Sequence, residues 1–288
     1  MSNNSFAVLL SVYNGAKFLH EQLDSILSQK MVCVHIFVSI DRSIDDSLKI
    51  IESYMERFDN ITLLPYGEIY GSAAKNFFRL ILEAGVSSDF QYIALSDQDD
   101  IWAEEKLYRA ASIMQKKSCS GYSSNLSAFW PDGRQELIVK NKSITNLDFL
   151  YESASAGCTF CLSFALYSGL KDFLVSCSEK DYISSHDWLI YAYARFSGER
   201  WCFDDKAPIF YRQHENNVAG VNVGFFAKMK RIKSLTFGWY QYDQSVMVKY
   251  FGRGESRFKR LSRGCFAFRR SPIESCIIFS LVLLGILK

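Results

Sequence analysis

The sequence has few prolines and almost no excess of one charge over the other. Of 288 residues only 4 are Pro, and Lys+Arg 33 nearly balance Asp+Glu 31, which leaves a formal net charge of +2. With 15% aromatic and 49% hydrophobic residues, this composition excludes a largely disordered chain and predicts a sizeable buried core. The small net charge by itself argues against a nucleic-acid partner. The length fits one large domain with a tail or a small appendage.

Several signatures of other protein classes are also missing. The first residues are polar and lead directly into a short apolar strand, so we expect no secretory signal. The only long apolar run, Cys276–Leu287, is shorter than the roughly 20 residues that span a bilayer. No GxxxxGK(S/T) phosphate loop, GxGxxG fingerprint or GxSxG elbow occurs. Among eight scattered cysteines, only Cys158 and Cys161 have CxxC spacing, and we expect reduced core thiols in a cytosolic protein.

The small net charge conceals two halves of opposite sign. Residues 225–270 contain 12 Lys or Arg and 2 acids, a net +10, whereas residues 1–224 carry −8. Aromatic residues are interleaved with these cations, which predicts an interfacial segment that binds anionic lipid headgroups. One alternative is a helical subdomain that packs its aromatics on the first domain. Another is nucleic-acid binding, which lacks any recognised motif.

Apolar strands alternate with amphipathic helices over the first 120 residues. We expect strands at 6–12, 32–40, 61–65 and 91–95, and helices at 16–29, 48–58, 73–82 and 103–116. This order is typical of βαβ units, which build a parallel sheet with helices on both faces. Beyond residue 120 the alternation weakens, with strands expected at 121–130, at 157–166 and within 201–211, and a helix at 188–196.

Polar residues follow directly after three of the expected strands. Ligands of such sheets bind at the carboxyl ends of the strands, so these positions are candidate site residues. The strongest signal is Asp97, Asp99 and Asp100, three carboxylates within four residues. They repel one another unless a cation lies between them, which predicts Mg²⁺ or Mn²⁺ together with substrate phosphates. The alternative is a solvated turn in which Asp100 caps the next helix.

Weaker candidates occur elsewhere along the chain. Asp187 opens an expected helix, where it could be a plain N-cap or a general base for a hydroxyl nucleophile. Arg212 could contact a diphosphate, and His214 could bind a metal or donate a hydrogen bond, although both could be ordinary surface residues. Asp41 and Asp45 could bind a base or ribose, or could serve as turn and cap residues.

Six segments in fixed order carry a resemblance to a known family. They are Tyr13-Asn14-Gly15, Ile40-Asp41-Arg42-Ser43, Ser96-Asp97-Gln98-Asp99-Asp100, Gly157-Cys158-Thr159, His186-Asp187-Trp188 and Tyr211–Asn217. Over residues 6–220 the sequence resembles family 2 glycosyltransferases with the GT-A fold, and most of all bacterial rhamnosyltransferase-like enzymes of cell-surface polysaccharide synthesis. Arg42 stands where the family often has Gly, which leaves base selectivity open. The QxxRW motif of processive members is absent, which favours one sugar per binding event.

The resemblance implies both a fold and an activity. The fold is α/β, a GT-A domain (Rossmann-like, a mostly parallel sheet with helices on both faces) over residues 1–222, followed by a basic, aromatic-rich helical segment over 223–288. The activity is inverting transfer of a sugar from a dTDP- or UDP-linked donor to a growing, lipid-linked surface glycan of O-antigen or capsule type. Mg²⁺ or Mn²⁺ is the expected cofactor. We expect a cytoplasmic protein, peripheral at the inner membrane, without a nucleic-acid partner.

The same resemblance assigns roles to individual residues. Asp187 matches the catalytic base. Contacts to the donor nucleotide are expected from Val12, Tyr13, Asn14, Asp41, Lys75, Asp97, Gln98 and Arg212. Metal ligands are expected at Asp99 and His214, and contacts to the acceptor or donor sugar at Trp102, Gly157, Cys158, His186 and Trp188. The alternatives are a non-catalytic GT-A scaffold that binds a glycan or a partner transferase, and a sugar nucleotidyltransferase, which would need a Gly-rich, basic loop after the first strand.

Overall fold

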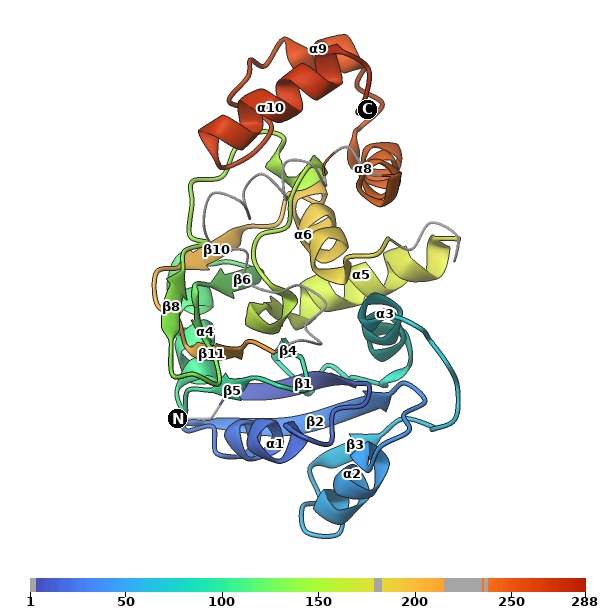
Figure 1. Ribbon diagram of the computed structural model, residues 1–288, viewed down its shortest axis with the longest axis vertical. Coiled ribbons are helices and arrows are strands. Elements are labelled where there is room, and N and C mark those ends of the chain that lie inside the picture. Colours follow the sequence, from blue (N-terminus) through green and yellow to red (C-terminus); the bar gives the residue numbers. More distant parts are fainter. Residues whose placement is uncertain (1–3, 179–182, 215–234, 236–237) are drawn as a thin grey trace.

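A seven-stranded sheet forms the centre of the molecule (Figure 1). The computed structural model describes residues 4–178, 183–214, 235 and 238–288. In sheet order the strands are β10 (Trp201–Asp204), β6 (Gly121–Ser124), β9 (Cys161–Ser163), β4 (Tyr92–Ser96), β1 (Asn4–Val12), β2 (Val32–Ile40) and β3 (Ile61–Leu63). Only β9 is antiparallel to its neighbours, β4 and β6. The mostly parallel sheet expected from the sequence is therefore confirmed.

Helices cover both faces of this sheet because its strands are apolar on both sides. In β1 the side chains of Phe6, Val8 and Leu10 face one core cluster, and those of Ala7 and Leu9 face the other. The first cluster includes α1 (Leu19–Leu27), α2 (Ser47–Met55) and α4 (Lys106–Lys117). The second includes α3 (Ala73–Glu83), α5 (Phe164–Ser176) and α6 (His186–Phe196). This two-faced arrangement confirms the α/β fold class.

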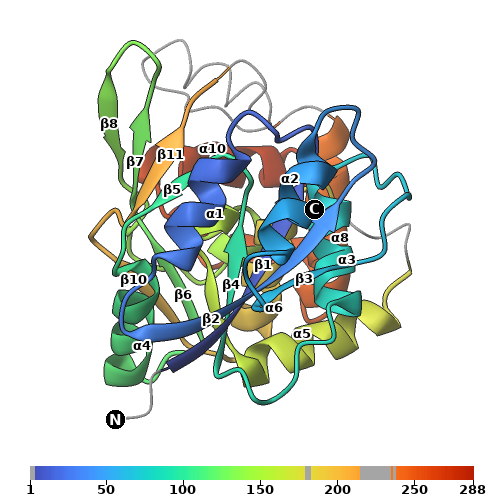
Figure 2. The same cartoon turned by 90° about the horizontal axis from the view of Figure 1, so that it is seen from below.

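A smaller sheet stands beside the main one (Figure 2). It contains β5 (Ile101–Trp102), β11 (Ile209–Arg212), β7 (Leu126–Phe129) and β8 (Gln135–Ile138), in that order. The antiparallel pair of β5 and β11 joins residues that follow β4 to the segment that ends in Arg212. Two segments that are far apart in the sequence thus meet at one edge of the main sheet.

Two of the expected strands were wrong in extent. The segment 121–130 forms β6 and β7, which belong to different sheets and are separated at the buried Asn125. The segment 157–166 forms a short 3₁₀ helix, η2 (Gly157–Thr159), then β9, then the start of α5, whose cap Ser163 accepts a hydrogen bond from the Leu166 N–H. A short apolar run is buried in any of these conformations, so its hydrophobicity does not choose between them.

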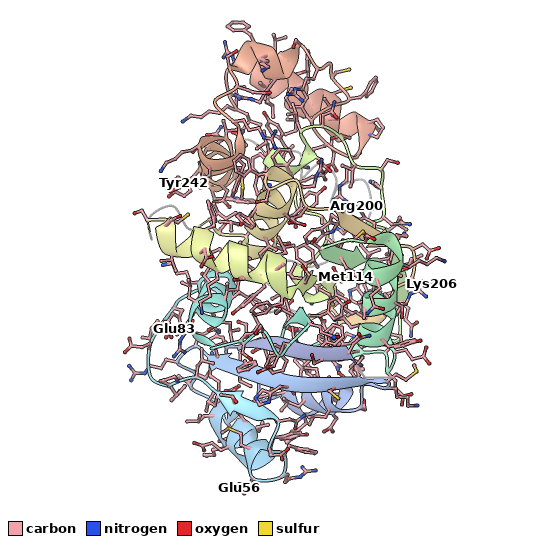
Figure 3. The ribbon with its side chains drawn as sticks, turned by 180° about the vertical axis from the view of Figure 1, so that it is seen from behind. Glu56, Glu83, Met114, Arg200, Lys206 and Tyr242 are labelled. Atoms are coloured by element: carbon pink, nitrogen blue, oxygen red, sulfur yellow. A yellow bond between two sulfur atoms is a disulfide. The ribbon has the colours of Figure 1, made fainter. Side chains whose placement is uncertain are left out.

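The C-terminal helices pack on the rest of the chain as an appendage, α8 (Gly238–Phe251), α9 (Arg257–Leu261) and α10 (Pro272–Leu283). Side chains fill the space between these helices and α6 (Figure 3, where Tyr242 marks α8). The buried guanidinium of Arg269 donates to the Tyr151 carbonyl, and Arg270 pairs with Glu152. Part of the basic tail therefore binds the rest of the chain, whereas the expected boundary at 222/223 lies outside the described residues. No helix in the described segments is long and apolar enough to cross a membrane.

The cysteines follow the expectation only in part. Cys158 and Cys161 are free and buried, as the sequence indicated. Cys119 and Cys202, however, form a disulfide, so the expectation of reduced thiols is wrong for this pair. The two residues are 83 positions apart in the sequence but lie on adjacent chain segments, because β6 and β10 are neighbours in the sheet. Sequence spacing could not predict a pairing that the sheet order creates.

Candidate active site

The candidate site lies at the carboxyl edge of the main sheet, where β1, β2 and β4 end side by side. The Tyr13 N–H donates to Gln98 Oε1 at 2.6 Å, and Gln98 Nε2 donates to the Tyr13 carbonyl at 2.9 Å. Gly15 leaves room for this contact, since a Cβ there would lie 2.4 Å from Gln98 Oε1. The side chain of Gln98 thus joins the loops after β1 and β4. Its expected contact with the donor stays a prediction.

Asn14 joins the loop after β1 to the loop after β2. Its N–H donates to Ser43 Oγ at 2.9 Å, and its Oδ1 accepts the Ile44 N–H at 2.9 Å. The φ of Asn14 is 48°, in the left-handed region that Asn tolerates better than most residues. The sequence Tyr-Asn-Gly therefore forms a tight, cross-linked turn at the place where a donor nucleotide is expected.

Asp41 is buried and holds the loop that leads into α3. Its two carboxylate oxygens accept the N–H groups of Tyr70 and Gly71, each at 2.8 Å. In the first turn of α3, Asn76 donates to the carbonyls of Val12 and Ser39. These contacts bring the exposed Lys75 to the same edge of the sheet as Val12 and Asp41.

Asp99 and His214 come together from distant parts of the chain. The distance from His214 Nε2 to Asp99 Oδ2 is 2.8 Å, and both side chains are partly exposed. Two ligand atoms at about 2.1 Å from one Mg²⁺ and at right angles to each other are about 3 Å apart. The pair therefore fits the ligand geometry of a single divalent cation.

Behind this pair lies a crowded acidic cluster of Asp97, Asp100 and Cys158, whose ligand atoms are all within 4.8 Å of one another. Burial, together with the nearby charges of Asp99 and Asp187, raises the pKa of Asp97 to about 7. Burial also raises the pKa of Asp100 well above its usual range, and Asp100 Oδ2 has no hydrogen-bond partner in the described structure. A divalent cation at this edge would relieve the repulsion among these carboxylates.

Arg212 is hydrogen-bonded to residues beside the acidic cluster. Its Nε donates to the Asp99 carbonyl at 2.9 Å, and its Nη2 donates to Glu21 Oε2 at 2.8 Å. The guanidinium carbon lies 4.7 Å from the ring centroid of Phe18 and 4.8 Å from that of Phe129. Arg212 thus adds positive charge beside the expected diphosphate while it holds the backbone of a metal-ligand candidate.

His186 and Asp187 begin α6 on the other side of the acidic cluster. Asp187 Oδ1 accepts the Trp188 N–H at 2.8 Å and the hydroxyl of Ser185. The His186 ring stacks on Phe77 with 4.0 Å between centroids, and burial lowers its pKa to about 4. The His186 imidazole beside Asp187 is therefore neutral near pH 7. Its Nε2 has no hydrogen-bond partner among the described residues.

Several expected sugar contacts lie behind the site rather than at its surface. Trp102, Cys158 and Trp188 are 3%, 0% and 4% exposed, so in this structure they offer almost no surface to a sugar. Gly157 is also buried, against the His186 ring. Residues that the sequence did not single out are the buried Lys106, whose Nζ lies 3.3 Å from the Trp102 ring centroid, and Asp243 of α8. A lone buried Lys or a helical Asp has no spacing signature that could have revealed them.

Comparison with known proteins gives consistent results. The profile of Glycosyl transferase family 2 matches residues 7–129. Across 289 aligned residues the chain is 34% identical to dTDP-rhamnosyl transferase RfbG of Shigella flexneri, covering 96% of this chain and 100% of that protein. The S. aureus TarS structure in complex with UDP-GlcNAc superposes with a TM-score of 0.57 at 19% identity, over 90% of this chain and 75% of TarS. GalNAc-T7 with UDP, GalNAc and Mn²⁺ also has a TM-score of 0.57, at 12% identity over 96% of this chain and 54% of that one.

Proposed function

Because this chain belongs to glycosyltransferase family 2, we propose that it transfers a rhamnosyl group from a dTDP-linked donor to a hydroxyl of a growing surface glycan. The chain is a glycosyltransferase with the GT-A fold, and 34% identity to a dTDP-rhamnosyl transferase over its length supports the choice of donor. The observation that carries the proposal is the meeting of Asp99 and His214, 2.8 Å apart, at the edge where β1, β2 and β4 end.

The donor nucleotide would lie across the loops after β1 and β2. Asp41 holds the backbone of Tyr70 and Gly71, and Tyr13 is exposed beside these loops. Each Asp41 oxygen keeps a second lone pair, which can accept the N–H of a pyrimidine base. Lys75 at the start of α3 and Arg212 supply positive charge for the diphosphate.

Asp99, His214 and Asp97 would hold Mg²⁺ or Mn²⁺ at this site. Such a cation neutralises negative charge on a leaving diphosphate. The residues fit, because the carboxylate and imidazole ligand atoms are at a separation that one ion allows and Asp97 lies close to the charges of Asp99 and Asp187. Arg212 holds the Asp99 backbone and so keeps the ligand set in place.

Asp187 would act as the base in a direct displacement. The acceptor hydroxyl oxygen forms a bond to the anomeric carbon while the bond from that carbon to the diphosphate oxygen breaks. The hydroxyl proton goes to the Asp187 carboxylate, and the configuration at the anomeric carbon inverts. Asp187 is close enough to Asp97 for its charge to raise the Asp97 pKa, which supports a position facing the donor.

The acceptor would be a lipid-linked glycan at the cytoplasmic face of the inner membrane. Exposed apolar side chains gather on the appendage, with Phe258 72%, Ile273 74% and Leu284 72% exposed. The exposed cations Lys259 and Arg263 belong to the same region, where both pair with the single carboxylate of Glu255 and leave a net positive charge. Cations beside exposed aromatics and aliphatics are typical of segments that lie in a membrane interface.

Donor use and metal dependence can be tested with a panel of nucleotide sugars. We expect nucleoside-diphosphate release from dTDP-rhamnose in the presence of acceptor and Mn²⁺ or Mg²⁺, and its loss with EDTA. Asp99→Ala should lose metal-dependent donor binding, whereas Asp187→Asn should bind donor normally but lose transfer by about 10³-fold or more. Transfer by Asp187→Asn at close to the wild-type rate would show that the base is another residue.

Membrane association can be tested by vesicle sedimentation. We expect binding to vesicles with anionic lipid at low salt, weaker binding at high salt, and none to neutral vesicles. The variant Lys259→Glu/Arg263→Glu should bind less, and Arg134→Glu, at an exposed site on the β7–β8 turn, is the matched control. Absence of binding at low salt would contradict the membrane proposal without affecting the assignment of the donor.

A further inference from the structure

We propose that α8 of the C-terminal appendage positions the catalytic base, through Asp243 and Tyr240. The inference rests on the proposed role of Asp187. It adds two positioning residues from the C-terminal part of the sequence. Asp243 lies 56 positions after Asp187 in the sequence. It nevertheless accepts hydrogen bonds from Ser184, in the turn that leads to Asp187.

On the N-terminal side of the base, Asp243 holds Ser184. The Ser184 N–H donates to both carboxylate oxygens of Asp243 at 3.2 Å, and its hydroxyl donates to Asp243 Oδ2. Asp243 is 1% exposed, so this carboxylate is withdrawn from water and makes its hydrogen bonds to the protein. A buried carboxylate without hydrogen-bond donors destabilises the fold, so this contact fixes the position of Ser184 against Asp243.

On the C-terminal side of the base, Tyr240 holds Trp188. The two rings stack with 5.3 Å between centroids and an interplanar angle of 24°. Trp188 Nε1 donates to the Phe149 carbonyl at 2.9 Å, and the Tyr240 hydroxyl donates to the Tyr151 carbonyl at 2.7 Å. Both rings are thus fixed in place as well as stacked.

These two contacts reach the base through its own hydrogen bonds. Asp187 Oδ1 accepts from the hydroxyl of Ser185, next to Ser184, and from the N–H of Trp188. The N-cap residue Ser185 makes no side-chain capping bond to the helix, so its side chain does not hold the first turn in the usual way. The contacts of Asp243 and Tyr240 therefore hold the turn that contains Asp187 in place.

A matched pair of substitutions on α8 tests the proposal. Asp243→Ala removes the acceptor for Ser184. Gln244→Ala removes a neighbouring, equally buried side chain whose amide pairs with the backbone of Lys288 instead. We expect Asp243→Ala to lower kcat by about 10- to 100-fold, the cost of a displacement near 1 Å at a reacting group. Donor affinity and the KM for donor should stay at wild-type values, and Gln244→Ala should transfer at close to the wild-type rate.

Two further variants separate positioning from general destabilisation. Asp243→Asn keeps one oxygen acceptor and should recover most of the lost kcat. Ser184→Ala removes the hydroxyl donor to Asp243 Oδ2 at an exposed position and should reproduce part of the loss. The proposal is overturned if folded Asp243→Ala and Gln244→Ala have the same kcat, or if Asp243→Asn is as slow as Asp243→Ala. If Asp187→Asn itself transfers normally, the failure lies in the base assignment and not in the role of α8.

Discussion

Substitution of Gly157 by Ala is a stringent test of how the base is held. Gly157 is buried in η2, and a Cβ built on it would lie 2.4 Å from His186 Nε2. Ordinary contact begins at 3.4 Å, so the His186 ring would have to move by about 1 Å. On its other face the ring stacks on Phe77 with 4.0 Å between centroids, and Phe77 is completely buried. The ring therefore cannot retreat without moving the start of α6.

The size of the effect follows from this geometry. His186 and Asp187 are adjacent on the first turn of α6, so a shift of about 1 Å in one carries the other with it. A misplacement of that size at a reacting group costs about 10²-fold in rate. Overpacking of this kind also lowers the free energy of unfolding by about 1–3 kcal/mol. We therefore expect Gly157→Ala to fold, to bind donor normally and to transfer about 100 times more slowly.

The assay is steady-state transfer at saturating donor, alongside donor affinity and thermal unfolding. The matched control is Gly121→Ala, where a Cβ would lie 2.2 Å from Cε3 of the buried Trp201, a comparable clash at the start of β6. That variant should lose stability but keep kcat. A second variant, Gly157→Ala/Phe77→Leu, gives the ring room on its other face and should recover part of the rate. Wild-type kcat in folded Gly157→Ala would refute the reasoning.

Two further predictions concern stability. Because the pKa of His186 falls from 6.5 to about 4 on folding, the unfolded chain binds more protons between these values, so this residue's contribution to stability falls as pH drops from 6.5 towards 4. From pH 7 to pH 4.5, the free energy of unfolding measured in urea should fall by about 2–3 kcal/mol more in wild type than in His186→Gln. An equal fall in both proteins would contradict the assignment. Arg109→Ala leaves the buried Asp204 without its bidentate partner at 2.6 and 2.7 Å and should cost about 2–3 kcal/mol by the same method. Arg134→Ala, which breaks an exposed ion pair, should cost less than about 1 kcal/mol, and similar losses for the two Arg variants would contradict this.

The candidate site was predictable where its residues are neighbours in sequence. Asp97 and Asp99 follow a strand that its apolar residues identify, and a parallel sheet brings such strand ends to one edge. The hydrogen-bond partners of Gln98 and Arg212 were not predictable in the same way. Both were expected to contact the donor, and both are hydrogen-bonded to backbone of neighbouring loops in the structure. A motif identifies a polar residue near a ligand, but its hydrogen-bond partners depend on which loops lie beside it.

The C-terminal basic region illustrates the same limit. Its charge and aromatic content suggested either a membrane-binding surface or packing on the first domain. In the structure Arg269 and Arg270 are turned inward to partners near residue 151, whereas Phe258 and Lys259 face outward. Packing on the first domain therefore applies to Arg269 and Arg270, whereas membrane binding by the outward-facing side chains stays a proposal. Composition gives the number of cations, but only the fold determines which of them pair with distant parts of the chain.

By itself the sequence determined the α/β class, the positions of the strand-end carboxylates and the family, because these depend on residues close together along the chain. Tertiary structure decided what depends on contacts between distant segments. It set the approach of His214 to Asp99, the pairing of Cys119 with Cys202 and the contact of Asp243 with Ser184. Local periodicity and spacing report on neighbours within a few residues, whereas these contacts join segments 59 to 115 residues apart and are fixed only when sheet and helices pack together.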